Sequence, residues 1–93
     1  MRVIGNIDHP ILKITAFKMD NKLSIKFESG LFEQTYKIRE SEQLSTFEDL
    51  QNLVDEGFIN DVIEELKKMN QIKKSAFSRY LTQAEEDEFE DII

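Results

Sequence analysis

The spacing of apolar residues changes near residue 40, and this change constrains the fold more than any other feature. From Ile11 to Arg39, apolar and polar side chains alternate, which is typical of strands with one buried face. From about residue 45, apolar residues are three and four positions apart, which is the spacing of amphipathic helices. The sequence therefore predicts an α+β fold in which an antiparallel meander comes first and two C-terminal helices pack on one of its faces.

Two short polar segments divide the alternating region into three strands. Asp20-Asn21 tolerates positive φ and suits a two-residue hairpin turn, and Ser29-Gly30 is the second turn candidate. The first turn pairs Lys13 with Glu28, and the second pairs Lys26 with Glu33, so two pairs of opposite charge face each other. Both turns place the same apolar set on one predicted dry face: Leu12, Ile14, Ala16, Leu23, Ile25, Phe27, Phe32, Tyr36 and Ile38.

A further strand is predicted at the N-terminus, so the meander has three or four strands. Val3, Gly5 and Ile7 alternate, and a turn through residues 8–11 would pair Val3 with Ala16. His9 is the only histidine and lies in this turn. We interpret it as a turn residue, because a general base also needs a partner and a pocket.

Two helices are predicted after the strands. Ser45 and Glu48 form a capping-box pattern, and Gly57 is the expected C-cap of the first helix. The second helix is expected to begin near residues 58–60 and to reach about Thr82. It would expose apolar residues beyond the sheet, where a second copy could cover them. Its apolar stripe is Val62, Leu66, Met69, Lys73, Ala76 and Tyr80.

Two polar residues fall on the predicted apolar side, namely Gln34 in the last strand and Lys73 in the second helix. They either lie at or beyond the sheet edge, or line a small polar notch between helix and sheet. Buried without partners, either side chain would cost several kcal/mol.

The length and charge of the chain suggest one domain followed by an acidic segment. Ninety-three residues support a single core, predicted over residues 1–84. Residues 1–39 carry seven basic and four acidic side chains, whereas residues 40–93 carry five and fifteen. Six of the seven residues from Glu85 to Asp91 are acidic, so segment 85–93 is expected to be a solvated tail.

A resemblance covers mainly the first forty residues. The segments Ile7-Asp8-His9-Pro10, Lys13-Ile14-Thr15 and Ile25-Lys26-Phe27-Glu28, together with Glu33-Gln34-Thr35-Tyr36-Lys37, are similar to those of a group of short bacterial proteins of unknown function. The group implies no activity, cofactor or site residue for this chain.

No combination of residues indicates catalysis. The chain has no cysteine and one histidine, which leaves only carboxylates for a metal site. Its three glycines do not form a phosphate-binding loop, so we predict no catalytic, cofactor-binding or metal-binding residues and no enzyme. A membrane span of about 18 apolar residues and a signal peptide are both lacking, so we expect no membrane contact and a cytoplasmic location.

The polar sheet face offers a speculative partner site. Four lysines are predicted to surround Phe17, and the apolar residues of the tail, Phe89 above all, could dock there within the chain or from a neighbour. The candidate residues are Lys13, Phe17, Lys22, Lys26, Lys37 and Phe89. The favoured function is a non-catalytic protein-interaction or regulatory module with an unknown protein partner. A homodimer through the second helix is a further prediction. The alternative is a nucleic-acid-binding protein that uses the lysine-rich face, which the overall acidity makes less favourable.

Overall fold

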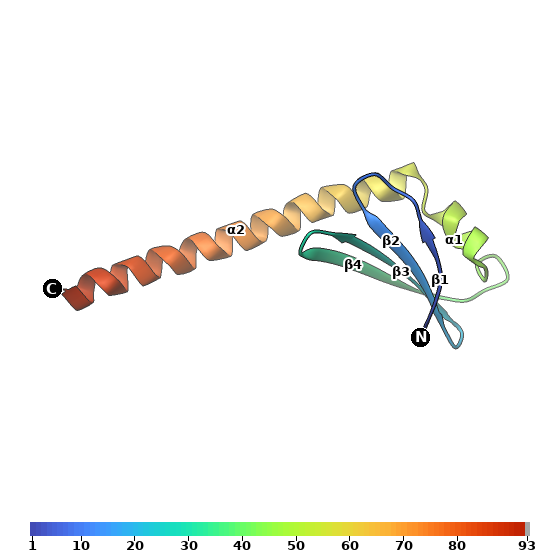
Figure 1. Cartoon of the computed structure of the whole chain (residues 1–93), viewed down its shortest axis with the longest axis horizontal. Coiled ribbons are helices and arrows are strands. Elements are labelled where there is room, and N and C mark those ends of the chain that lie inside the picture. The colour runs from blue at the N-terminus through green and yellow to red at the C-terminus, as the bar shows by residue number, and fades with distance from the viewer. Residues whose placement is uncertain (93) are drawn as a thin grey trace.

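The computed structural model describes the backbone of residues 1–92 and the side chains of residues 1–83. Four antiparallel strands form one sheet in the order β1-β2-β3-β4, and two helices follow (Figure 1). The predicted α+β meander with two C-terminal helices is therefore confirmed, with four strands rather than three. The elements are β1 Arg2–Ile7, β2 Lys13–Met19, β3 Lys22–Ser29, β4 Phe32–Arg39, α1 Phe47–Leu53 and α2 Glu56–Ile92.

The β2–β3 hairpin has the predicted turn and register. Asp20 adopts a φ of 55°, which the short Asp side chain tolerates. Ile14 faces Phe27 and Lys13 faces Glu28 across the two strands. The alternation of apolar residues with a positive-φ turn dipeptide was therefore sufficient to fix this pairing.

The β3–β4 hairpin is shifted by two residues from the predicted register. Ser29 pairs with Phe32, so the turn is Gly30-Leu31 and Gly30 takes a φ of 60°. A shift of two leaves every side chain on its predicted face. The predicted pair of Lys26 with Glu33 is nevertheless wrong, because Lys26 lies opposite Thr35.

Strand β1 also differs from its predicted register. Gly5 pairs with Ala16, and an irregularity between Val3 and Gly5 turns Val3 to the polar face opposite Phe17. The preceding prediction that Val3 faces Ala16 is therefore wrong. The β1–β2 turn is longer than expected, since Ile7 pairs with Ile14. Within this turn, the His9 Nδ1 atom accepts hydrogen bonds from the backbone N–H groups of residues 11 and 12, each at 3.2 Å. His9 is thus a turn residue, as predicted.

Helix α1 begins one residue later than the predicted capping box. Thr46 is the N-cap, and its hydroxyl accepts from the Asp49 N–H while the Asp49 carboxylate accepts from Thr46 and Ser45. These backbone hydrogen bonds lower the pKa of the Asp49 carboxyl below its usual 3.8. Asp reaches the N-cap backbone here, so the predicted Ser45–Glu48 pair is wrong.

Helix α2 begins earlier than expected, at Glu56. The Asp55 carboxylate accepts a hydrogen bond of 2.8 Å from the Phe58 N–H, which caps the new helix. Gly57 therefore lies within the first turn of α2, and Val54 is the C-cap of α1. The prediction of Gly57 as a C-cap is wrong because a second cap follows the first helix immediately.

The core lies between the sheet and the two helices. Leu50 and Val54 belong to the α1 region and Val62 and Leu66 to α2; all four pack with the dry face of β2 and β3. Gln34 on the edge strand β4 donates a hydrogen bond of 3.0 Å to the Val62 carbonyl of α2. Gln34 therefore lies at the sheet edge and also bridges helix and sheet, so both alternatives describe it in part.

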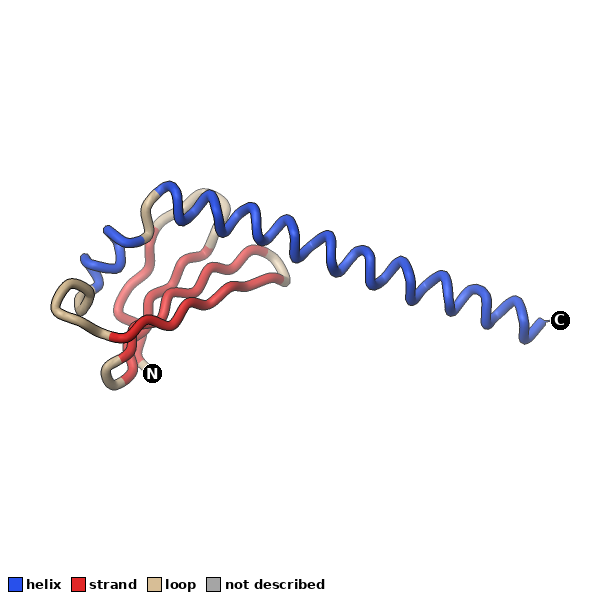
Figure 2. Tube along the Cα trace, turned by 180° about the vertical axis from the view of Figure 1, so that it is seen from behind, coloured by secondary structure: helices blue, strands red, loops and turns tan. Residues whose placement is uncertain are grey.

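Helix α2 extends far beyond the sheet (Figures 1 and 2). The radius of gyration is 19.2 Å, whereas a compact chain of this length would have about 12 Å. The backbone remains helical past the predicted limits at residues 82 and 84 and ends at Ile92. Among the described residues, neither helix combines the length and apolarity that crossing a bilayer requires.

Candidate interaction surface

The part of α2 beyond the sheet carries large apolar side chains in contact with solvent. Ile72, Phe77, Tyr80 and Leu81 are between 53% and 68% exposed. Phe77, Tyr80 and Leu81 follow Leu66 at helical spacing, so they continue the face that packs on the sheet. The predicted exposure of apolar residues near Phe77 is confirmed, and we name residues 72–83 the overhang of α2.

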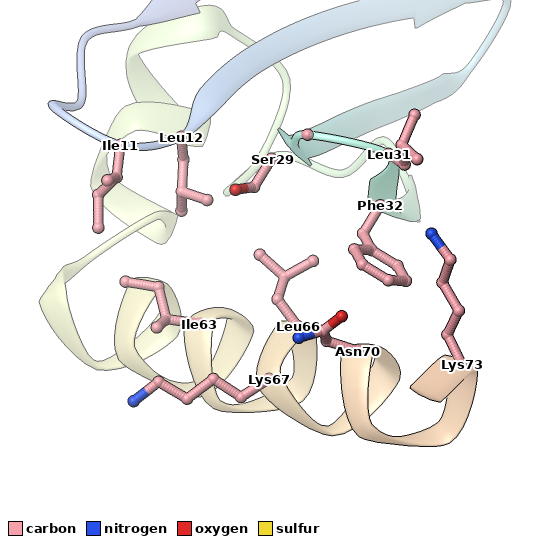
Figure 3. Close-up of a pocket in the computed structure, with 11 residues that line it drawn as sticks. Ile11, Leu12, Ser29, Leu31, Phe32, Ile63, Leu66, Lys67, Asn70 and Lys73 are labelled. Carbon is pink, nitrogen blue, oxygen red and sulfur yellow. The ribbon is translucent and has the colours of Figure 1, made fainter. Parts of the chain in front are cut away.

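A hollow of about 420 Å³ lies where α2 leaves the sheet. Figure 3 shows Ile63 and Leu66 on its helical side, with Leu12 and Phe32 opposite them on the sheet side. Leu31 at the tip of the β3–β4 turn also lines the hollow and is 86% exposed. The hollow therefore has a largely apolar lining, and Lys73 at its edge belongs to the overhang.

Lys73 connects the hollow with the overhang. Its Nζ atom lies 5.3 Å from the ring centroid of Phe32 and 5.9 Å from that of Phe77. Both distances are within the range of cation–π attraction. The predicted interruption of the apolar stripe at Lys73 is thus a positively charged group between two aromatic rings at the sheet edge.

Charge is strongly segregated along α2. No acidic residue occurs between Glu65 and Glu85, and the five basic residues of the second half of the chain lie in this interval. These five residues form what we name the basic segment: Lys67, Lys68, Lys73, Lys74 and Arg79. The acidic segment, Glu85 to Asp91, follows it directly along the helix.

The predicted lysine face is only partly assembled. Lys26 places its Nζ 5.3 Å from the Phe17 ring centroid, and the same atom is 3.3 Å from a Glu28 carboxylate oxygen. Lys13 lies opposite Glu28 in the sheet, so acidic side chains interrupt this part of the face. Glu33 also lies opposite Glu28, which places two carboxylates at one end of the sheet.

The other two lysines lie toward the opposite end of the same face. Lys22 pairs with Arg39 and Lys37 pairs with Ser24. Phe89, the sixth candidate, lies on the far part of α2, and its side chain is outside the described ones. Figure 1 shows α2 leading away from the sheet, so the acidic segment does not fold back onto the lysine face within the chain. Docking on a neighbour's sheet stays a prediction.

One buried hydroxyl on this face has no hydrogen-bond partner. Thr15 is 6% exposed, and its Oγ1 atom is unpartnered. It pairs with Lys26 across the sheet.

Sequence reasoning identified part of the lining of the hollow, including Lys73 in the alternative of a notch between helix and sheet. It missed Leu31, which the two-residue register shift places in the turn beside α2. Asn70, between Leu66 and Lys73 on the same helix face, also went unnoticed. The available signal was the exposed leucine after Gly30, because a turn rarely needs an apolar residue.

Comparisons with protein-family models, curated proteins and solved structures find no match to this chain. Within the described side chains, no group of three or more His, Asp or Glu residues is placed to hold a metal ion. The candidate site is therefore defined by its own geometry: an apolar overhang, a hollow at its base and a basic segment along it.

Proposed function

We propose that the chain is a non-catalytic protein-interaction module that binds a partner helix along the overhang of α2. The observation that carries this proposal is the exposure of Phe77, Tyr80 and Leu81 on the face that buries Leu66. Most helical stability in proteins comes from packing of an apolar face. A helix that leaves its sheet with that face uncovered is suited to receive another helix there.

The chemistry of the overhang specifies the kind of helix that would bind. Its apolar face continues into a hollow of about 420 Å³, so a partner could bury side chains at both places. Lys67 and Lys73 line this hollow, so acidic residues on the partner would be attracted to it. The expected partner is therefore an amphipathic helix with acidic flanks.

The test compares an overhang variant with a matched sheet-face variant. Phe77→Glu with Leu81→Glu changes only exposed side chains of the overhang, and Lys22→Glu with Lys37→Glu changes two exposed lysines on the sheet. Proteins cross-linked to the tagged wild-type chain in its native cells, further copies of this chain included, would be identified and then purified.

Direct titration of each purified partner decides the outcome. We expect at least one partner to bind the wild-type chain and the sheet-face variant equally, and to lose about tenfold or more in affinity for the overhang variant. If no purified partner depends on Phe77 and Leu81, the proposed function is wrong.

Nucleic-acid binding is the second candidate, supported by the basic end of the sheet where Lys22 faces Arg39. Phosphate contacts strengthen as salt falls. Labelled single-stranded DNA and RNA should then bind at low salt, and Lys22→Glu with Lys37→Glu should abolish binding. Absence of binding at low salt would eliminate this candidate, and the two carboxylates at the other end of the face favour that result.

A further inference from the structure

We propose that the helix covering the overhang is α2 of a second copy of this chain, running antiparallel to the first. The inference rests on the proposed function and names its partner. It joins three observations: the uncovered apolar face, the segregation of charge along α2, and the hollow at the base of the overhang.

The acidic segment carries no positive charge of its own to offset its repulsion within the helix. Six of its seven residues are acidic, and like charges three or four positions apart destabilise a helix. The segment also lies at the C-terminal end of α2, where the helix dipole disfavours negative charge, and the last turn has no basic residue. The backbone is nevertheless helical to Ile92.

The basic segment of a second copy supplies this charge only in one orientation. Parallel helices would place acidic segment beside acidic segment and basic beside basic, which is repulsive in both places. Antiparallel helices instead place the acidic segment of each copy beside the part of the other copy's basic segment that contains Lys73 and Lys74. The symmetry of such a pair is a two-fold axis, so both contacts form at once.

One register satisfies both the charges and the apolar face. When Tyr80 lies opposite Leu81 of the second copy, position 77 lies opposite position 84. Counting outward, positions 73 and 74 lie opposite positions 88 and 87 of the second copy. The first two positions hold lysines in the sequence, and the other two hold a Glu and an Asp. Positions 73, 77, 80, 84 and 88 recur at helical spacing, so they share one face.

The same register brings the end of the second helix to the hollow. Position 91 of the second copy lies opposite Asn70, which lines the hollow between Leu66 and Lys73 (Figure 3). The pair would overlap from about position 69 to position 92, a length of about 35 Å at 1.5 Å per residue. The second copy's last turn would therefore close the open side of the hollow.

The first experiment is a charge exchange measured by sedimentation equilibrium. The wild-type chain should show a mass approaching twice 10.9 kDa as its concentration rises, with weaker association at high salt. Lys73→Glu with Lys74→Glu should weaken self-association by about tenfold or more, and so should Asp87→Lys with Glu88→Lys. An equimolar mixture of the two variants should associate at least as tightly as the wild type.

The second experiment determines the relative orientation of the two α2 helices by disulfide cross-linking. Because the chain has no native cysteine, only the introduced cysteines can form a disulfide. Asn70→Cys in a tagged copy and Asp91→Cys in an untagged copy should form the mixed disulfide on oxidation. In the antiparallel register, the two positions 70 lie about 32 Å apart along the helix, too far for a disulfide. A predominance of Asn70→Cys homodisulfides would indicate parallel helices and overturn the proposal.

The outcomes separate this inference from the proposed function. The second copy is not the helix that covers the overhang if the wild-type chain stays monomeric at high micromolar concentration. The same conclusion follows if mixing the two charge variants fails to restore association. The proposed function would survive either result if a different partner depends on Phe77 and Leu81. As a control, Lys22→Glu with Lys37→Glu should leave self-association unchanged, and a comparable loss would overturn the assignment to α2.

Discussion

The two halves of α2 repeat the same apolar spacing but have different surroundings. Val62 and Leu66 are buried against the sheet, whereas Phe77, Tyr80 and Leu81 are more than half exposed. The strand β3 has eight residues and spans about 26 Å, whereas the 37 residues of α2 span about 55 Å. Periodicity therefore defines which face of a helix is apolar, and the length of the opposing sheet defines how much of that face is covered.

The strongest way to test this difference is to shorten one leucine in each half. Leu66→Ala should lower the free energy of unfolding by about 2–5 kcal/mol, because the truncation leaves a cavity under the sheet. Leu81→Ala should change it by less than about 0.5 kcal/mol at low micromolar concentration, because the side chain is exposed. Urea denaturation of both variants measures the two values, and equal losses would show that the overhang is already packed in the monomer.

Two glycines, Gly5 and Gly57, allow the same comparison between a backbone position covered by a side chain and one that is open. A Cβ atom on Gly5 would come within 2.5–2.7 Å of the Phe47 ring atoms, whereas one on Gly57 would meet only Asp55 Oδ1, at 3.6 Å. Gly5→Ala should therefore cost about 1–3 kcal/mol through displacement of α1.

Gly57→Ala should instead stabilise the protein by about 0.4–1 kcal/mol, because alanine favours the first turn of α2. Thermal unfolding of the two variants shows whether each substitution raises or lowers the stability of the protein. A stabilising Gly5→Ala would mean that the Phe47 ring is free to move aside.

The hydrogen bond from Gln34 to α2 is expected to contribute less. Gln34→Ala removes the donor to the Val62 carbonyl and should cost about 1–2 kcal/mol, part of it because the partly buried carbonyl is left without its partner. Thr35→Ala, on the opposite face of the same strand and exposed, is the matched control with an expected change within about 0.5 kcal/mol. Chemical denaturation that fails to distinguish the two variants would show that water replaces the Gln34 amide.

The smallest expected effect is a pH dependence at the α1 N-cap. The folded pKa of Asp49 lies below 3.8, so its contribution to stability is present above that value and is lost as pH falls through the lowered folded pKa. The difference in stability between the wild type and Asp49→Asn should therefore be constant near neutrality and shrink in acid. A difference that is independent of pH down to complete protonation would contradict the capping role of the charged carboxylate.

Most of the fold follows from local patterns in the sequence. The alternation around Asp20-Asn21 determined the β2–β3 pairing, and the residues predicted for the dry face share one face despite the shift of β4, although Tyr36 on the edge strand is exposed. The register of β4 was wrong by two residues, a shift that leaves the face pattern unchanged. The register of β1 was also wrong, and its irregularity between Val3 and Gly5 moved Val3 to the other face. The cap of α1 was misplaced because two Ser/Thr-to-acid pairs of equal spacing lie side by side.

The candidate site was less accessible to sequence reasoning, although its charges were visible. The sequence by itself determined which face of α2 is apolar, that basic and acidic segments follow one another, and that no cysteine is available. Only the tertiary structure decided that the sheet ends near Lys73, that Leu31 reaches α2, and that a hollow forms between them. The physical reason is that periodicity and charge are properties of neighbouring residues, whereas coverage depends on where separate elements end in space.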